Sequence, residues 1–149
     1  MRGRSSMNVR RFPPDDPQEW LSRARSNLRQ ARVEIEGVYL EDLCFDAQQA
    51  AEKAIKAVLI HRKVAFPYVH DLARLLTLVE QTGQAVPELI KQAARLSRYA
   101  VAARYPGVVE PVSQEDYREV VSIAEAVVRW AQQMVTPQSE KSGEADGES

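Results

Sequence analysis

The sequence predicts an all-α protein: an up-and-down antiparallel helical bundle with four main helices and one short helix. Apolar residues recur at steps of three and four along most of the 149-residue chain, which is the period of an amphipathic helix. No segment alternates polar and apolar residues as a half-buried strand would. Short connections join the periodic segments, and short connections favour antiparallel neighbours.

The first helix is predicted to begin at Pro17. Asp16 is a typical N-cap residue, and proline is favoured at the first helical position. An apolar stripe then follows at helical spacing: Trp20, Leu21, Ala24, Leu28, Ala31, Ile35 and Val38. The opposite face holds charged residues, which we interpret as a solvated surface: Arg23, Arg25, Arg29, Arg32, Glu34 and Glu36. Gly37 weakens the end of this helix.

The second helix is predicted from about Asp42 to Arg62. Its apolar line consists mostly of alanine, which allows close approach between helices: Ala47, Ala51, Ala54 and Val58. Its polar face is expected to hold Asp42, Asp46, Gln49, Glu52, Lys53 and Lys56. Glu52 and Lys56 are four residues apart in the favourable order for an ion pair. Lys53 and Lys56 have two interpretations: they hold a phosphate as point charges, or they belong to a solvated helix face.

A short third helix and a fourth helix follow a connection over residues 63–70, where Pro67 prevents a continuous helix. The third helix has a periodic apolar set, Leu72, Leu75, Leu76 and Val79, and Gly83 suits its C-terminal cap. Pro87 opens the fourth helix, whose predicted apolar face holds Leu89, Ile90, Ala93, Leu96, Ala100 and Val101. Pro106-Gly107 is expected to end it.

The last helix is predicted to begin after Ser113, which forms a capping box with Asp116. Its apolar residues cover nearly half of the helix circumference: Tyr117, Val120, Val121, Ile123, Ala124, Val127, Val128, Ala131 and Met134. So wide an arc indicates contacts on two sides. These contacts lie either in the bundle centre or also across a subunit interface.

Composition excludes several classes of function. The chain has 20 basic and 21 acidic residues, so its net charge of −1 argues against a broad sequence-independent nucleic-acid binder. No run approaches 18 apolar residues and no signal peptide is recognisable, so we expect no membrane contact and a cytoplasmic location. With one cysteine the chain cannot form an internal disulfide, and its two histidines argue against a multi-histidine metal site. We expect no cofactor. Cys44 is expected to be inert core.

Both ends of the chain are polar and lack hydrophobic periodicity. We therefore expect three parts: a disordered basic arm over residues 1–15, a folded bundle over 16–136 and a disordered acidic tail over 137–149. Residues 1–11 contain four arginines and no acid, and residues 137–149 have a net charge of −3. The arm either touches nucleic acid or acidic lipid, or only solubilises the chain.

Two short segments are candidates for chemistry. His70 beside Asp71 has the residue types of a general base or a ligand contact. Alternatively, Asp71 caps the helix that follows and His70 caps the same end or packs over Tyr68. Arg104 falls in line with the apolar face of the fourth helix. Either the helix frays before Pro106, or Arg104 and Tyr105 lie at a cleft or subunit seam where they bind phosphate and stack a base.

Three stretches in order resemble the HEPN family of small helical proteins, which are named for a proposed nucleotide-binding role. They are the alanine-rich FDAQQAAEKAIKAVL over residues 45–59, the segment HDL over 70–72 with Leu75 after it, and ARYP over 103–106. Together they cover about residues 17–135. The resemblance implies a bundle that is often a homodimer and often works beside a minimal nucleotidyltransferase. It implies a nucleotide-binding site at Lys53, His70, Asp71, Arg104 and Tyr105.

A second branch of the HEPN family consists of metal-independent RNases, among them toxins of toxin–antitoxin pairs. Their signature is an arginine, four to six residues and then a histidine, late in the domain. This chain departs from it: seven residues lie between Arg62 and His70, and no histidine follows Arg104. The family's cleavage mechanism therefore lacks an obvious general acid or base in this chain. We expect the chain to have no catalytic residue and not to act as an enzyme on its own.

The sequence therefore favours a HEPN-type accessory protein that binds a nucleotide or RNA, forms a homodimer and assists a minimal nucleotidyltransferase. Two alternatives remain. One is a HEPN endoribonuclease toxin with an unusual residue set, and the other is a structural dimerisation module.

Overall fold

The computed structural model describes residues 9–102, 105 and 111–136, and this part of the chain is helical without any strand. In order, the elements are α1 (Pro17–Arg32), α2 (Leu40–His61), α3 (Leu72–Gln81), α4 (Glu88–Lys91), the 3₁₀ helix η2 (Gln92–Ser97), α5 (Arg98–Ala102) and α6 (Gln114–Val135). The predicted basic arm lies partly outside the described residues, and the acidic tail, Arg104 and Pro106-Gly107 lie wholly outside them.

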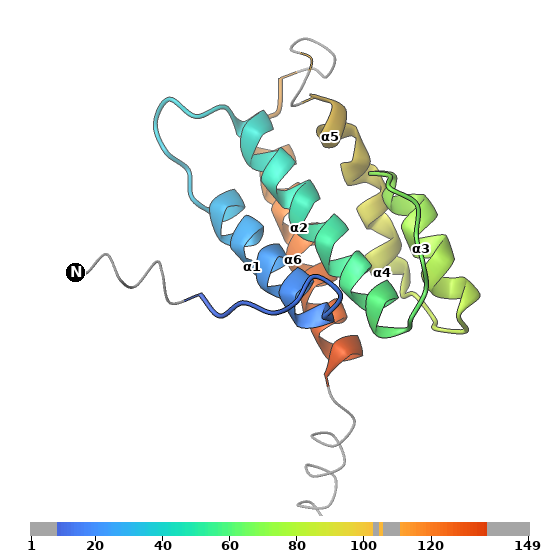
Figure 1. Cartoon of the computed structure of the whole chain (residues 1–149). Helices are drawn as coiled ribbons and strands as arrows, with labels where there is room; N and C mark the ends of the chain where they lie inside the picture. Colours follow the sequence, from blue (N-terminus) through green and yellow to red (C-terminus); the bar gives the residue numbers. More distant parts are fainter. Residues whose placement is uncertain (1–8, 103–104, 106–110, 137–149) are drawn as a thin grey trace, which may run out of the picture.

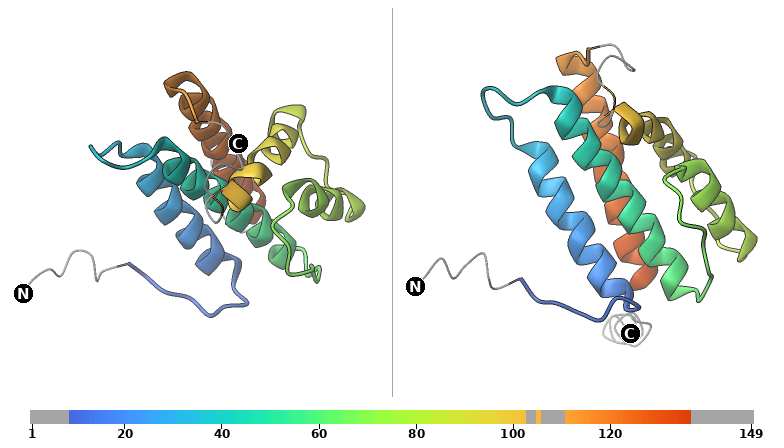
Figure 2. Two further views of the ribbon diagram at one scale, coloured as in Figure 1. Left: turned by 90° about the horizontal axis from the view of Figure 1, so that it is seen from above. Right: turned by 45° about the horizontal axis from the view of Figure 1, so that its top comes forward.

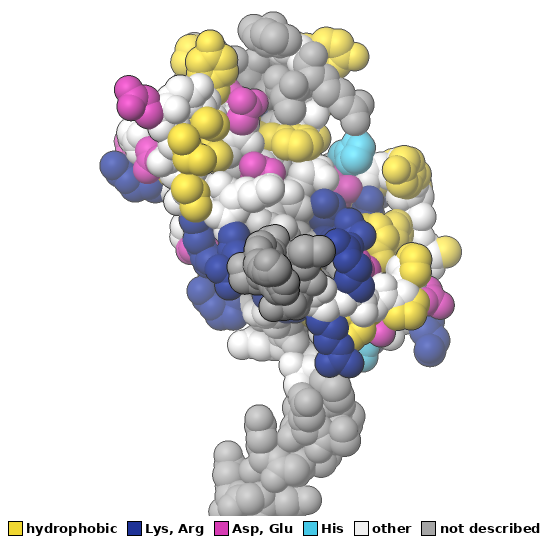
Figure 3. Space-filling model, turned by 60° about the vertical axis from the view of Figure 1, so that its left-hand side comes forward, with side chains coloured by type: hydrophobic (Ala, Val, Ile, Leu, Met, Phe, Trp, Pro, Cys, Tyr) yellow, Lys and Arg dark blue, Asp and Glu magenta, His cyan; other side chains and the backbone are white. Residues whose placement is uncertain are grey.

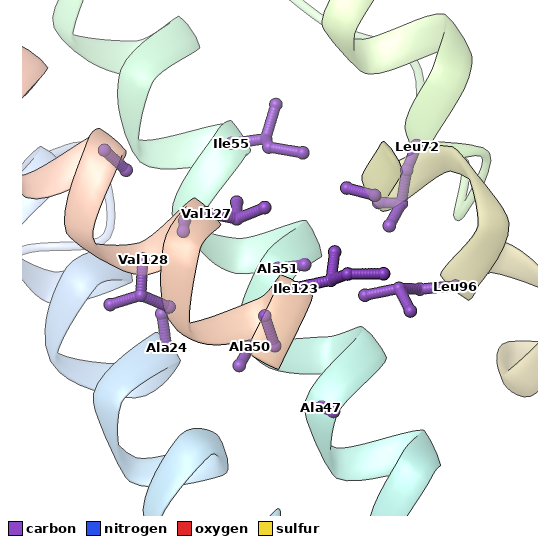
Figure 4. Close-up of a cluster of buried hydrophobic side chains, with 14 of the residues drawn as sticks. Ala24, Ala47, Ala50, Ala51, Ile55, Leu72, Leu96, Ile123, Val127 and Val128 are labelled. Atoms are coloured by element: carbon purple, nitrogen blue, oxygen red, sulfur yellow. The ribbon is translucent and has the colours of Figure 1, made fainter. Parts of the chain in front are cut away.

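The elements form a helical bundle, as predicted, but α3 runs in the same direction as α2, because Arg62 at the end of α2 donates to Thr82 at the end of α3. The long helices α1, α2 and α6 lie side by side, and α2 separates α1 from the layer made by α3 and α5 (Figures 1 and 2). The core contains Ala24 and Val128 at the α1–α6 contact, and Ile55 and Val127 at the α2–α6 contact (Figure 4). The fully buried alanines of α2 allow its neighbours to approach closely. The wide apolar arc of α6 is therefore explained by the bundle centre.

Helix α1 is shorter than its apolar pattern suggests. It ends at Arg32, and Val33 is already extended at the C-cap. Ile35 is 59% exposed and Val38 is 39% exposed, so the predicted continuation of the stripe is wrong. The helix has already ended before Gly37, whose φ of +89° belongs to the turn that leads toward α2.

The predicted fourth helix is divided into α4, η2 and α5. Four of its buried residues, Ile90, Ala93, Leu96 and Tyr99, lie at steps of three, and Ala100 is buried as well. A 3₁₀ helix has three residues per turn, so within η2 this step keeps Ala93 and Leu96 on one face. Leu89 in α4 and Val101 in α5 were both expected on the apolar face, but they are exposed.

The predicted helix starts are confirmed by their caps. Asp16 accepts a hydrogen bond from Gln18 N at 2.9 Å, and Ser113 Oγ accepts one from Asp116 N at 3.0 Å. The backbone N–H of Leu72 donates to Ser97 Oγ at 3.0 Å, which ties the start of α3 to the end of η2. This link fixes the segment before α3 against α5, where the candidate site lies.

Two kinds of feature are absent from the described part of the chain. No described helix has the length and apolar character needed to cross a membrane. Within the same residues, no group of three or more His, Cys, Asp and Glu side chains is arranged to hold a metal ion.

Candidate functional site

A buried carboxylate organises the site. Glu52 in α2 is only 3% exposed and accepts hydrogen bonds from three side chains. Lys56 Nζ lies 2.8 Å from Oε2, Gln48 Nε2 lies 2.8 Å from Oε1, and His70 Nδ1 lies 2.9 Å from Oε1. A buried charge is tolerated only when it is paired and hydrogen-bonded in this way.

The charge on Glu52 determines how His70 is protonated. Burial pushes the pKa of Glu52 upward, but the hydrogen bonds from Lys56, His70 and Gln48 outweigh it and leave this pKa below the ordinary 4.5. An ionised carboxylate can only accept hydrogen bonds. The Nδ1 atom of His70 must therefore donate, which leaves Nε2 as the nitrogen that can serve a ligand.

Lys56 completes the buried group. Its Nζ lies 5.5 Å from the ring centroid of Phe66, 5.7 Å from that of Tyr68 and 5.9 Å from that of Trp20. Rings at such distances attract a cation. The Glu52–Lys56 pair predicted from the sequence is confirmed, but its placement on a solvated face is wrong, because both side chains are 4% exposed.

A hollow of about 250 Å³ opens beside His70. It lies between the start of α3 and α5, and its lining residues are His70, Asp71, Ser97, Ala100, Val101 and Tyr105. The His70 side chain is 44% exposed, and Tyr105 is 60% exposed. Sites for whole drug-sized ligands are somewhat larger, at about 300–1,000 Å³, so this hollow has room for only a part of such a ligand.

Asp71 serves the helix that it precedes. Its Oδ1 accepts a hydrogen bond from Ala73 N at 3.1 Å, which makes it the N-cap of α3. The capping interpretation of Asp71 is therefore confirmed. His70 does not share this cap, because its ring nitrogen is bound to Glu52.

The structure separates Lys53 from the other predicted site residues. Lys53 Nζ donates to Asn27 Oδ1 at 2.8 Å, and Asn27 Nδ2 donates to Asp46 Oδ1 at 3.3 Å, so Lys53 lies at the seam of α1 and α2. Burial lowers the pKa of Lys53, and the positive charge of Arg23 acts in the same direction. His70, Asp71 and Tyr105 share the hollow, and Arg104 lies outside the described residues.

Sequence reasoning missed Glu52 and Ser97 as parts of this site. One signal for Glu52 was available: Gln48, Glu52 and Lys56 follow each other at steps of four, directly beside the buried alanine line. Polar residues on such a border are often buried with one another. No sequence signal pointed to Ser97, because its partner Leu72 N is 25 positions away.

Comparison with known proteins places the chain in a family. The model of the HEPN domain matches residues 17–134, and the chain therefore belongs to the HEPN family. No match was found among curated proteins.

Two solved structures are similar to the chain. One is ST0689, described as an archaeal HEPN homologue, with 27% identity, a TM-score of 0.66 and coverage of 81% of this chain and 98% of that one. The other is TT1696 from Thermus thermophilus, with 28% identity, a TM-score of 0.66 and coverage of 79% of this chain and 97% of that one. The shared fold thus extends over nearly the whole of each neighbour.

Proposed function

We propose that this HEPN protein binds a nucleotide or the phosphate of a nucleic acid in the hollow beside His70, as a non-catalytic, homodimeric partner of a minimal nucleotidyltransferase. One observation supports this above all. The ionised, buried Glu52 holds His70 by Nδ1 at the edge of a hollow that also contains the exposed ring of Tyr105. A fixed imidazole is suited to a phosphate contact, and an exposed aromatic ring is suited to base stacking.

Each residue of the proposed site has a separate role. The protonated form of His70 donates from Nε2–H to the phosphate, and the Tyr105 ring stacks on the base. Arg104, the neighbour of Tyr105, adds a guanidinium for the phosphate. Asp71 positions His70 by capping α3, and Lys53 contributes positive potential from the α1–α2 seam without touching the ligand.

Nucleotide titration of the full chain tests the proposal. Binding of ATP and of a short single-stranded RNA is measured by calorimetry for wild type, Arg104→Ala, His70→Ala and Tyr105→Ala. Arg74→Ala is the matched control, because Arg74 is exposed on α3 and does not line the hollow. We expect at least a tenfold loss for the three site variants and no change for the control. Equal affinity in all variants, or no binding by wild type, would contradict the proposal.

The Glu52–His70 pair also favours a second candidate, an endoribonuclease with an unusual residue set. A carboxylate that orients an imidazole is the arrangement of a general acid–base group. Incubation of the purified chain with RNA distinguishes the two functions. Specific cleavage that disappears in His70→Ala would establish the nuclease and overturn the non-catalytic interpretation.

A further inference from the structure

Five arginines line a continuous groove on the side of the bundle formed by α1 and α6. Its upper part is a hollow of about 260 Å³ whose lining includes Arg25, Arg29 and Arg32 from α1, and Glu125, Arg129 and Gln132 from α6. Its lower part, of about 420 Å³, adds Arg10 and Thr136. Arg25 and Gln132 line both parts, so the two hollows form one surface, here called the arginine groove.

The arginine groove has an excess of positive charge. Arg32 Nε lies 2.7 Å from Glu125 Oε2, so these two charges compensate each other. Within the described ranges, the other four arginines of the groove form no ion pair: Arg10, Arg25, Arg29 and Arg129. Figure 3 shows Lys and Arg side chains gathered around the middle of the face that carries α1. Such a surface fits a chain of negative charges.

The same polypeptide supplies a segment of that kind. Helix α6 ends at Val135, and the next residue, Thr136, lines the lower end of the groove. The following residues, 137–149, contain one lysine and four acids: Glu140, Glu144, Asp146 and Glu148. An extended chain spans at most about 3.5 Å per residue, so four residues reach about 14 Å and twelve reach about 40 Å. A groove that follows α6 back to Glu125 over eleven residues is about 16 Å long at 1.5 Å per residue. The acids therefore reach every arginine in it.

We propose that the acidic segment 137–149 occupies the arginine groove of its own chain. Each exposed ion pair is worth only about 0–1 kcal/mol. A short tether raises the effective concentration of the segment to the millimolar range, so several weak pairs suffice to keep it in place. The occupied groove has little excess charge left.

A spin label on the segment tests this directly. Ser142→Cys provides the attachment site, and the only native cysteine, Cys44, is fully buried and does not compete for the label. We expect broadening of the amide signals of Arg25, Arg29 and Arg129 at 20 mM salt, and loss of this broadening at 500 mM salt because exposed charges are then screened. The double variant Arg25→Gln/Arg29→Gln should also lose it. Arg74→Gln/Arg98→Gln, on the opposite side of α2, is the matched control and should keep it.

Three results would overturn the proposal. The first is the absence of broadening at low salt, and the second is broadening spread evenly over the surface. The third is broadening found only when labelled chains are mixed with unlabelled isotope-enriched chains, since this shows that the segment reaches another molecule.

Discussion

The Nδ1 atom of His70 lies 2.9 Å from Oε1 of Glu52, although eighteen positions separate the two residues along the chain. His70 comes shortly before α3, whereas Glu52 lies inside α2 and is 3% exposed. Their contact ties the connection between α2 and α3 to the body of α2. The edge of the hollow is therefore held in place by a buried charge.

Glu52→Gln is expected to destabilise the protein by about 3–5 kcal/mol. The substitution keeps the shape but removes the charge, and it leaves the Lys56 ammonium buried without its counter-ion. Urea unfolding followed by circular dichroism measures the change. Glu80→Gln is the control: Glu80 also pairs with a lysine, Lys91, but its side chain is 42% exposed, so its loss should cost less than about 1 kcal/mol. Equal effects would refute the structural role of Glu52.

Stability should decrease in acid partly through Glu52. Hydrogen bonds hold the pKa of Glu52 below its ordinary value of 4.5 in the folded state. A depressed carboxyl pKa adds stability that is present above the unfolded pKa and is lost as the pH falls through the folded pKa. Unfolding free energies between pH 6 and pH 3 should therefore fall more steeply for wild type than for Glu52→Gln. Parallel curves for the two proteins would count against this assignment.

Tyr117→Phe should cost about 1–2 kcal/mol. The hydroxyl of Tyr117 in α6 donates a buried hydrogen bond to the backbone carbonyl of Ala31, at the end of α1. Removing the hydroxyl leaves that carbonyl without this donor, away from water. Tyr39→Phe is the control, since Tyr39 is 75% exposed and should tolerate the change. Thermal unfolding of both variants gives the comparison.

Cys44 should not react with thiol reagents in the native protein. The side chain is fully buried, and burial raises the pKa of its thiol to about 12, with Glu41 and Asp116 acting in the same direction. The reactive thiolate is therefore nearly absent at neutral pH. Absorbance after addition of an aromatic disulfide reagent should stay flat until urea is added. Rapid labelling without urea would show that the core opens around α2.

Local signals were sufficient to predict most of the fold. The caps at Asp16, Asp71 and Ser113 are encoded within three residues, and so the starts of α1, α3 and α6 could be placed correctly. The division of the fourth helix was missed, although Ile90, Ala93, Leu96 and Tyr99 recur at steps of three. Steps of three also belong to the three-and-four pattern of an α-helix, so the apolar pattern does not reveal the change to a 3₁₀ helix.

The site was less accessible to sequence reasoning. The Glu52–His70 contact joins two elements, and no pattern within either one predicts it. The arginine groove was hidden for a different reason. Net charge averages over the whole chain, whereas Arg25 and Arg29 meet Arg129 only after α1 and α6 pack antiparallel. From the sequence, the charged face of the first helix had indicated only a solvated surface.

The winding of η2 sets the direction of the hollow's wall. A 3₁₀ helix turns about 120° per residue and rises about 2.0 Å, against about 100° and 1.5 Å in an α-helix. Over the six residues of η2 this adds roughly 3 Å of length and about a third of a turn. An α-helical register from Gln92 onward would therefore swing Ala100 and Val101 away from His70. The winding of η2 therefore determines which side chains of α5 face the hollow. A family member with the same side chains but an α-helix in place of η2 would have a hollow of different shape.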